Sequence, residues 1–262
     1  MTRHVREYVA APFRQIASLR ETEHRPWPRR SFPWVIGQSW LDLLFLHWPV
    51  PAARLRPHVP APLELDERDG TAWLGITPFE IVGFRLVVSP PVPKLSSFPE
   101  LNVRTYVTYR GKPGIWFLSL DAASRLAVAA ARRFYRLPYF HASMEAKRVG
   151  DAVSFRSERV DPRGHVAAFS LRYEPDGDER RPPPGSLAAF LVERYCLYAT
   201  GERGQILRAE IHHPPWRLRA ALIDVAENTM PPPGLELPSE QPLAHYAARQ
   251  DVLIWPPGAA AD

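Results

Sequence analysis

Residues 98–144 read FPELNVRTYVTYRGKPGIWFLSLDAASRLAVAAARRFYRLPYFHASM, and this stretch decides the fold. Its first part alternates between two sets of side chains, which is typical of a half-buried antiparallel strand. The side chains expected on one face are Leu101, Val103, Thr105 and Val107, and those expected on the other are Asn102, Arg104, Tyr106 and Thr108. A Lys-Pro-Gly turn at 112–114 then leads into a second strand over 115–120.

The second half of this stretch predicts a helix that packs on a sheet. Asp121 can cap a helix over 122–135, where a series of alanines permits a close approach to the strands. Further strands are expected at 40–50, 71–86, 140–148, 152–160, 166–173, 205–213, 216–226 and 244–255, and a second helix at 186–194. Many antiparallel strands with two or three short helices predict a mainly β (α+β) protein built on a barrel or sandwich.

The length and composition fit one large domain or two small ones. The chain has 262 residues, 45% of them hydrophobic, and its 30 prolines argue against long helices. We expect an irregular N-terminal arm at 1–35, a single domain at 36–256 and a flexible tail at 257–262. One cysteine excludes an internal disulfide. Because no apolar run approaches the ~18 residues of a membrane span, we expect no membrane partner and a cytoplasmic location.

The positive charge of the chain does not indicate a nucleic-acid partner. The formal net charge is +5, but the arginines are dispersed along the sequence. Proteins that bind nucleic acids usually concentrate basic residues in a stripe or carry a recognisable module. We therefore expect a solvated basic surface, with a small molecule as the partner, and the sequence leaves a homo-oligomer open.

The chain resembles the uncharacterised bacterial DUF2071 (YqjF-like) family. The motifs that carry the resemblance are HWPVPAARLRPHVPAPLELDERDGTAWLGITPF, PELNVRTYV, GKPGIWFLSLDA, AARRFYRLPYFHA, FLVERYCLY, HHPPWRL and HYAARQDVLIWPP. That family in turn is similar to acetoacetate decarboxylase. The resemblance implies an antiparallel, cone-shaped β-barrel with a central ligand cavity, a topology that periodicity alone does not give.

The resemblance does not extend to the lysine that would identify the reaction. Arg132 and Pro138 match the decarboxylase motif, but Tyr139 and Phe140 replace its two lysines, including the one that forms a Schiff base. Schiff-base catalysis needs a primary amine that is neutral at the working pH. The three lysines, Lys94, Lys112 and Lys147, all lie elsewhere, so we expect no iminium chemistry.

The polar residues that remain can still form a site. Glu100 matches an acidic residue of the decarboxylases and shares a strand face with Asn102, Arg104 and Tyr106. In a cavity, Arg104 can bind a carboxylate, while Glu100 acts as general acid or base. Alternatively, Glu100 and Arg104 form a buried structural pair and the tyrosines only fill the barrel.

Four other residues complete the candidate site. Tyr139 and His141 share a face and can pass a proton, although a plug and a satisfied histidine are the structural alternatives. Arg132 contacts substrate or anchors its helix through a carboxylate such as Asp121. Trp116 lines the cavity or belongs to the core. The adjacent His212 and His213 point to opposite faces of a strand, so we expect no metal, and no motif indicates a cofactor.

Two classes of function remain open. The first is an enzyme that acts on a small carboxylated or β-dicarbonyl molecule as a lyase, hydratase, isomerase or cyclase, by acid–base catalysis without a lysine. The second is a barrel that binds such a molecule as a carrier or sensor.

Overall fold

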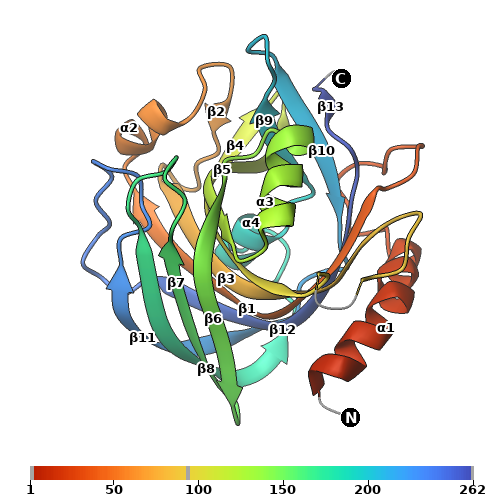
Figure 1. Ribbon diagram of the computed structural model, residues 1–262. Coiled ribbons are helices and arrows are strands. Elements are labelled where there is room, and N and C mark those ends of the chain that lie inside the picture. The colour runs from red at the N-terminus through yellow and green to blue at the C-terminus, as the bar shows by residue number, and fades with distance from the viewer. Residues whose placement is uncertain (1–2, 93–94, 261–262) are drawn as a thin grey trace.

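The computed structural model describes residues 3–92 and 95–260, in which thirteen strands form one sheet. Four short α-helices accompany it (Figure 1). The strands are β1 (Ile36–Val50), β2 (Glu64–Leu65), β3 (Ala72–Leu86), β4 (Phe98–Tyr109), β5 (Lys112–Ala122), β6 (Tyr139–Val149), β7 (Ala152–Arg159), β8 (Ala168–Arg180), β9 (Cys196–Thr200), β10 (Ile206–His212), β11 (Leu218–Asn228), β12 (Leu243–Ile254) and β13 (Gly258–Ala259). The helices are α1 (Arg3–Ala17), α2 (Ala52–Leu55), α3 (Arg125–Ala130) and α4 (Leu187–Val192).

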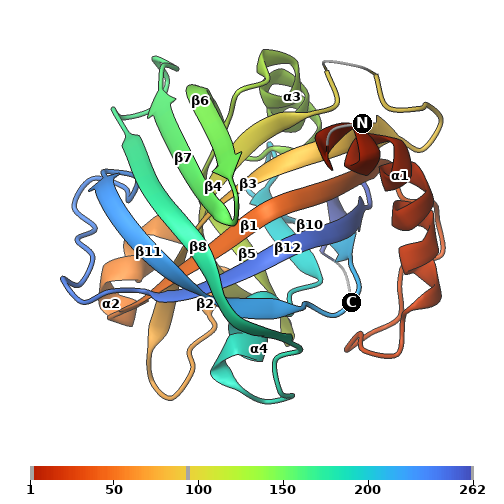
Figure 2. The same cartoon turned by 90° about the horizontal axis from the view of Figure 1, so that it is seen from below.

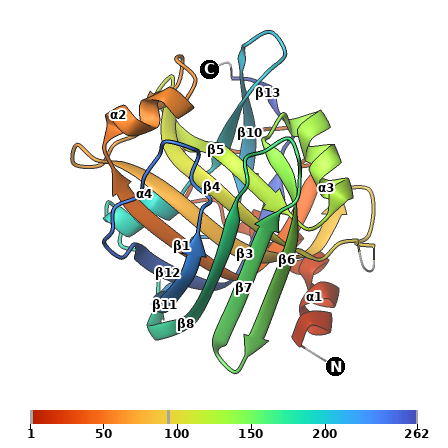
Figure 3. The ribbon, with the colours of Figure 1, turned by 60° about the vertical axis from the view of Figure 1, so that its left-hand side comes forward.

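The sheet closes on itself twice. One ring runs through β4, β5, β6, β7, β8, β11, β12, β1 and β3 and returns to β4. A second ring runs from β5 through β9 and β10 to β12. It shares the strands β12, β1, β3, β4 and β5 with the first ring, and these are the central strands. Figure 3 shows β6, β7, β8 and β11 on one side of the central strands and β10 on the other. The predicted mainly β barrel is confirmed.

The two faces of the central strands bury different cores. One face packs apolar side chains of β4 such as Leu101 and Val103 against Phe155 and Tyr173 from β7 and β8. The opposite face packs Tyr106 of β4 against side chains of α3 and α4. The alternation predicted for β4 is therefore confirmed, because Leu101 and Val103 lie on one face while Tyr106 lies on the other.

The helix over 122–135 differs from its prediction. It begins at Arg125, and Ser124 rather than Asp121 caps it by accepting a hydrogen bond from the backbone N–H of Ala127. The helix then widens into a π-turn over Ala131–Tyr135, which ends at Arg136 in the left-handed region. Because a helical connection spans the gap, β6 pairs with β5 in parallel rather than antiparallel orientation.

The N-terminal arm was expected to be irregular, but part of it is helical. Residues 3–17 form α1, followed by a 3₁₀ turn at Ser18–Arg20 (Figure 2). The amide of Gln15 holds this helix to the sheet, since it donates to the backbone oxygen of Gly83 at 3.1 Å and accepts from Arg85 at 2.9 Å. The prolines misled the prediction because Pro12 lies inside the helix.

The C-terminal segment 257–262 was expected to be a flexible tail. Gly258 and Ala259 instead form β13, which pairs with Arg208 and Leu207 of β10. Residues 261–262 lie outside the described part of the chain. Two other strands differ from the prediction: β8 continues to Arg180, past the expected end at 173, and β9 (Cys196–Thr200) was not predicted. The helix expected over 186–194 is found as α4, which begins at Leu187 after the cap Ser186.

Candidate functional site

Alternate residues of β4 present polar groups on the face that α3 and α4 cover. Glu100, Asn102 and Arg104 are each only 5% exposed. On the neighbouring strand β3, Gly75 pairs with Arg104 and Thr77 pairs with Asn102. These polar groups therefore form a track across two adjacent strands. At about 3.3 Å per residue, the backbone positions of Glu100 and Arg104 are about 13 Å apart.

Glu100 and Tyr139 form one end of this track. The Tyr139 hydroxyl donates a hydrogen bond to Glu100 Oε2 at 3.0 Å. Burial raises the pKa of Glu100 to about 8; the Tyr139 hydrogen bond opposes this shift and the nearby Asp121 adds to it. Burial also holds the pKa of Tyr139 well above its usual value. At neutral pH both groups are therefore protonated, and Glu100 is a buried neutral acid.

The π-turn and β6 fix the position of Tyr139. Leu120 of β5 pairs with Tyr139, whose carbonyl oxygen accepts a hydrogen bond from Arg132 Nη1 at 2.9 Å. Arg132 thus anchors the helix through a backbone oxygen, and the prediction that it pairs with a carboxylate is wrong. Asp121 pairs with Arg159 instead, at 2.7 Å.

Arg104 marks the other end of the track. Its guanidinium carbon lies 5.1 Å from the ring centre of Phe45 and 5.8 Å from that of Tyr106. Among the described residues, its buried Nε has no hydrogen-bond partner. Across residues 3–92 and 95–260, no carboxylate forms an ion pair with Arg104, so the alternative of a Glu100–Arg104 structural pair is not realised.

His47, which the sequence analysis did not select, lies beside Arg104. Its Nε2 lies 2.7 Å from the Tyr106 hydroxyl, while its buried Nδ1 has no partner in the part of the chain that the structure describes. Burial, reinforced by the positive charge of Arg104, lowers the pKa of His47 well below its usual value. His47 is therefore a neutral imidazole with one free ring nitrogen. A Cβ at Gly75 would lie 3.3 Å from both His47 and Arg104, so glycine makes room for this group.

Several more polar atoms of this interior have no hydrogen-bond partner in residues 3–92 and 95–260. They are Thr77 Oγ1, Asn102 Oδ1, Trp73 Nε1, Trp216 Nε1 and His245 Nδ1. Trp73 and Trp216 belong to the same cluster as Tyr106, and His245 pairs with Phe45 across β1 and β12. A buried polar group without a partner costs about 1–3 kcal/mol. So many on one face are typical of a surface that receives a polar molecule.

Two predicted site residues lie apart from this track. Trp116 packs against another cluster and donates from its Nε1 to the backbone oxygen of His58 at 3.0 Å. His141 is on the strand face of Tyr139 but is partly buried, and its backbone N–H donates to Asp161. The structure therefore brings together Glu100, Tyr139, Asn102, Arg104 and Tyr106, and it adds His47.

Neither described lysine lies on this track. Lys147 is 67% exposed and pairs with Glu145 at 2.6 Å, while Lys112 lies at the turn between β4 and β5. Lys94 falls outside the described residues. Within the same described ranges, no group of three or more metal-ligating side chains could hold an ion, and no helix is long and apolar enough to cross a membrane.

Comparison with known proteins identifies relatives in sequence. The family model DUF2071, described as an uncharacterized conserved protein, matches residues 37–251. The uncharacterized protein YqjF of Bacillus subtilis (strain 168) is 46% identical over 224 residues, which cover 85% of this chain and 91% of that protein.

Solved structures show the same fold at low identity. The enduracididine biosynthesis enzyme MppR, in complex with pyruvate, matches with a TM-score of 0.64 and 11% identity over 92% of this chain and 94% of that one. Acetoacetate decarboxylase from Legionella pneumophila matches with a TM-score of 0.55 and 15% identity over the same shares. The acetoacetate decarboxylase-like fold expected from the motifs is confirmed.

Proposed function

The chain belongs to the DUF2071 family, and on that premise we propose that it is an enzyme acting on a small carboxylated molecule without a Schiff-base lysine. The observation that carries the proposal is a buried arginine without a carboxylate partner, on the same strand face as a buried, protonated glutamic acid. An unpaired buried charge is costly, and a ligand carboxylate would compensate it.

The proposed roles follow from the charges at the two ends of the track. Arg104 binds the carboxylate, because its planar guanidinium can donate two hydrogen bonds to it. The protonated Glu100 donates its proton to a carbonyl oxygen of the substrate and becomes a carboxylate that the Tyr139 hydroxyl stabilises. The free Nδ1 of His47 accepts the proton that leaves the neighbouring carbon. A β-dicarbonyl or 2-oxo acid offers both the carboxylate and such an oxygen.

The fold neighbours support this choice of ligand. The MppR structure was obtained with pyruvate, a small 2-oxo acid, and the other neighbour decarboxylates acetoacetate. Tyr139 stands where the reactive lysine of the decarboxylases belongs, so an acid–base reaction replaces iminium chemistry in the proposal.

The test uses pyruvate and acetoacetate as probes. We expect both to bind the wild-type protein in calorimetry, and we expect the protein to catalyse deuterium exchange at the carbon next to the carbonyl, measured by NMR. Glu100→Gln should still bind but lose exchange by a hundredfold or more, the usual contribution of a general acid. The matched control Glu145→Gln, at an exposed position, should behave as wild type.

Two outcomes would redirect the proposal. If wild-type protein binds the probes through Arg104 but exchanges nothing, the chain is the carrier or sensor, which the existing Glu100–Tyr139 hydrogen bond favours. If borohydride traps a lysine-linked adduct with acetoacetate, the lysine-independent mechanism is wrong.

A further inference from the structure

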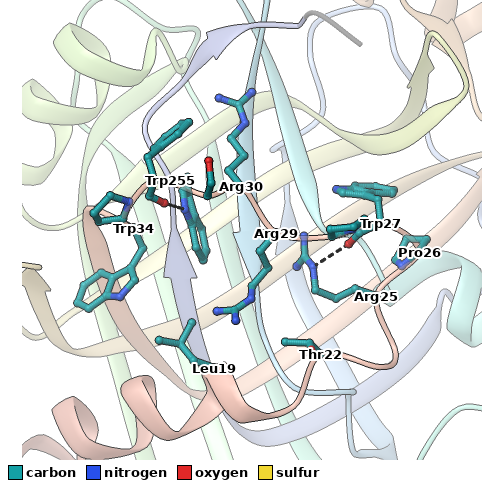
Figure 4. Close-up of a pocket in the computed structure, with 13 residues that line it drawn as sticks. Leu19, Thr22, Arg25, Pro26, Trp27, Arg29, Arg30, Trp34 and Trp255 are labelled. Atoms are coloured by element: carbon teal, nitrogen blue, oxygen red, sulfur yellow. Dashed lines mark hydrogen bonds between the residues drawn. The ribbon is translucent and has the colours of Figure 1, made fainter.

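A pocket lies outside the sheet, where the N-terminal arm crosses the end of β12. It has a volume of about 670 Å³ and is lined mainly by residues 25–34, together with Leu19, Thr22 and Trp255 (Figure 4). This volume is within the ~300–1,000 Å³ of small-molecule sites. None of the residues that line it belongs to the track on β4.

The residues that line this pocket include three arginines and no carboxylate, and the nearest acidic partner is Glu210, which does not line it. Arg25 pairs with the buried Glu210 at 3.2 Å, and Arg208 approaches the other oxygen of Glu210 at 3.1 Å. Two guanidiniums thus share one carboxylate. Arg29 and Arg30 add two further charges from the same loop. The group therefore has an excess of three positive charges.

Whereas Arg30 donates to the backbone oxygen of Arg208 at 3.4 Å, Arg29 is the least compensated arginine of this pocket. Among residues 3–92 and 95–260, nothing forms an ion pair or a hydrogen bond with its side chain. Its charge helps to lower the pKa values of Arg25 and His212, after burial as the main cause. Figure 4 shows Arg29 pointing between Leu19, Thr22 and Trp255, whereas Arg30 points away from it.

Indole rings supply the apolar wall of the pocket. The Nε1 of Trp27 donates to Glu210 at 2.8 Å, and the Nε1 of Trp255 donates to the backbone oxygen of Phe32 at 2.6 Å. These polar tips already have partners. Trp255 is only 3% exposed and belongs to a core cluster, so the partly exposed ring carbons of Trp27 are the main apolar surface for a ligand. Trp34 completes the wall and has Arg85 over its ring at 4.6 Å.

From this combination we propose that the arm pocket is a second binding site, specific for a small ring-bearing anion. Arg29 binds the carboxylate or phosphate of the ligand, and the indole of Trp27 contacts its ring. Guanidinium donors recognise both anions through the same paired hydrogen bonds, while aromatic rings contribute contact area at little entropic cost. The site requires both the ring and the charge.

The test is calorimetry with the full chain at low ionic strength, because screening weakens partly exposed charges. The probes are benzoate and adenosine 5′-monophosphate. Acetate is the analogue of benzoate that lacks the ring, and adenosine is the analogue of the nucleotide that lacks the charge. We expect at least one ring-bearing anion to bind at least tenfold more tightly than its partial analogue. Arg29→Gln should weaken that binding at least tenfold. The control Arg156→Gln removes an exposed arginine elsewhere and should leave it unchanged.

Three results would overturn the second site. The first is that neither benzoate nor adenosine 5′-monophosphate binds. The second is that benzoate binds no more tightly than acetate and adenosine 5′-monophosphate binds no more tightly than adenosine. The third is that Arg29→Gln and Arg156→Gln weaken binding equally. The Arg104→Met variant separates the two sites, since its interior carboxylate site is removed and the arm pocket is intact. Circular dichroism confirms that each variant is folded.

Discussion

Two buried acid–arginine regions lie side by side in this protein and handle charge differently. Asp121 on β5 is fully buried and receives three hydrogen bonds from Arg159, at 2.7, 3.1 and 3.1 Å. On the adjacent strand, Glu100 is neutralised by its own proton, and Arg104 forms no ion pair with any carboxylate of the described residues. The first region is a complete structural pair. The second is complete only with a further anion, and this difference separates scaffold from candidate site.

The largest expected effect comes from breaking the complete pair. Arg159→Leu leaves Asp121 as a buried charge without its partner, so the free energy of unfolding should fall by about 3–5 kcal/mol. Chemical denaturation at pH 7 measures this change. A loss below about 1 kcal/mol would show that the pair is not structural and would remove the contrast with Arg104.

The second effect has the opposite sign and depends on pH. The folded pKa of Glu100 is about 8, raised above its ordinary 4.5, so the folded state holds a proton that the unfolded state releases between these values. Wild-type stability from this group therefore falls as pH rises from about 4.5 to about 8. Glu100→Gln cannot lose that proton and should be more stable at pH 7 by up to ~3 kcal/mol.

The difference between the two unfolding curves isolates this group from the other titrating residues. It should be small at pH 4, grow up to about pH 8 and then stay constant. A difference that does not change with pH would mean that Glu100 is ionised in the folded protein, and the proposed general acid would be wrong.

A smaller effect is expected from removing the uncompensated cation. Arg104→Met replaces a buried guanidinium without a carboxylate partner by an apolar side chain, so stability should be unchanged or rise by about 1–2 kcal/mol. Binding of pyruvate should be lost at the same time. The matched control is Arg194→Met, because Arg194 pairs with Asp66 and should lose stability when replaced. A destabilised Arg104→Met would make Arg104 a structural residue.

The sequence predicted the faces of β4 but not the closure of the sheet. Alternation assigned Leu101 and Val103 to one side and Arg104 to the other, because period-two burial is a local property. The parallel pairing of β5 with β6 and β9 joins distant segments, and no local pattern encodes it. The local sequence predicts Asp121 as a helix cap because its true partner, Arg159, lies far along the chain.

The residues of the candidate site could be predicted from the sequence on β4, where polar and apolar residues alternate. They could not be predicted on strands that are buried on both faces. His47 lies in β1, whose residues are apolar on both sides, so periodicity cannot tell which core a histidine faces. Trp116 was placed in the site because it is aromatic and lies in a strand. Residue type does not specify the face, and its indole donates to His58 in another cluster.

The smallest expected effect refines the comparison at Glu100 itself. The Tyr139 hydroxyl donates to Glu100 Oε2 and opposes the rise in the pKa of that carboxyl. In Tyr139→Phe this opposition is lost, so the pKa of Glu100 should move above 8 and the pH-dependent loss of stability should extend to higher pH. The change corresponds to about 1 kcal/mol, the net worth of one hydrogen bond, and is measured against wild type across pH 6–10. An unchanged or lower midpoint would mean that the hydroxyl does not favour the carboxylate, and Tyr139 would then only fill the space beside Glu100.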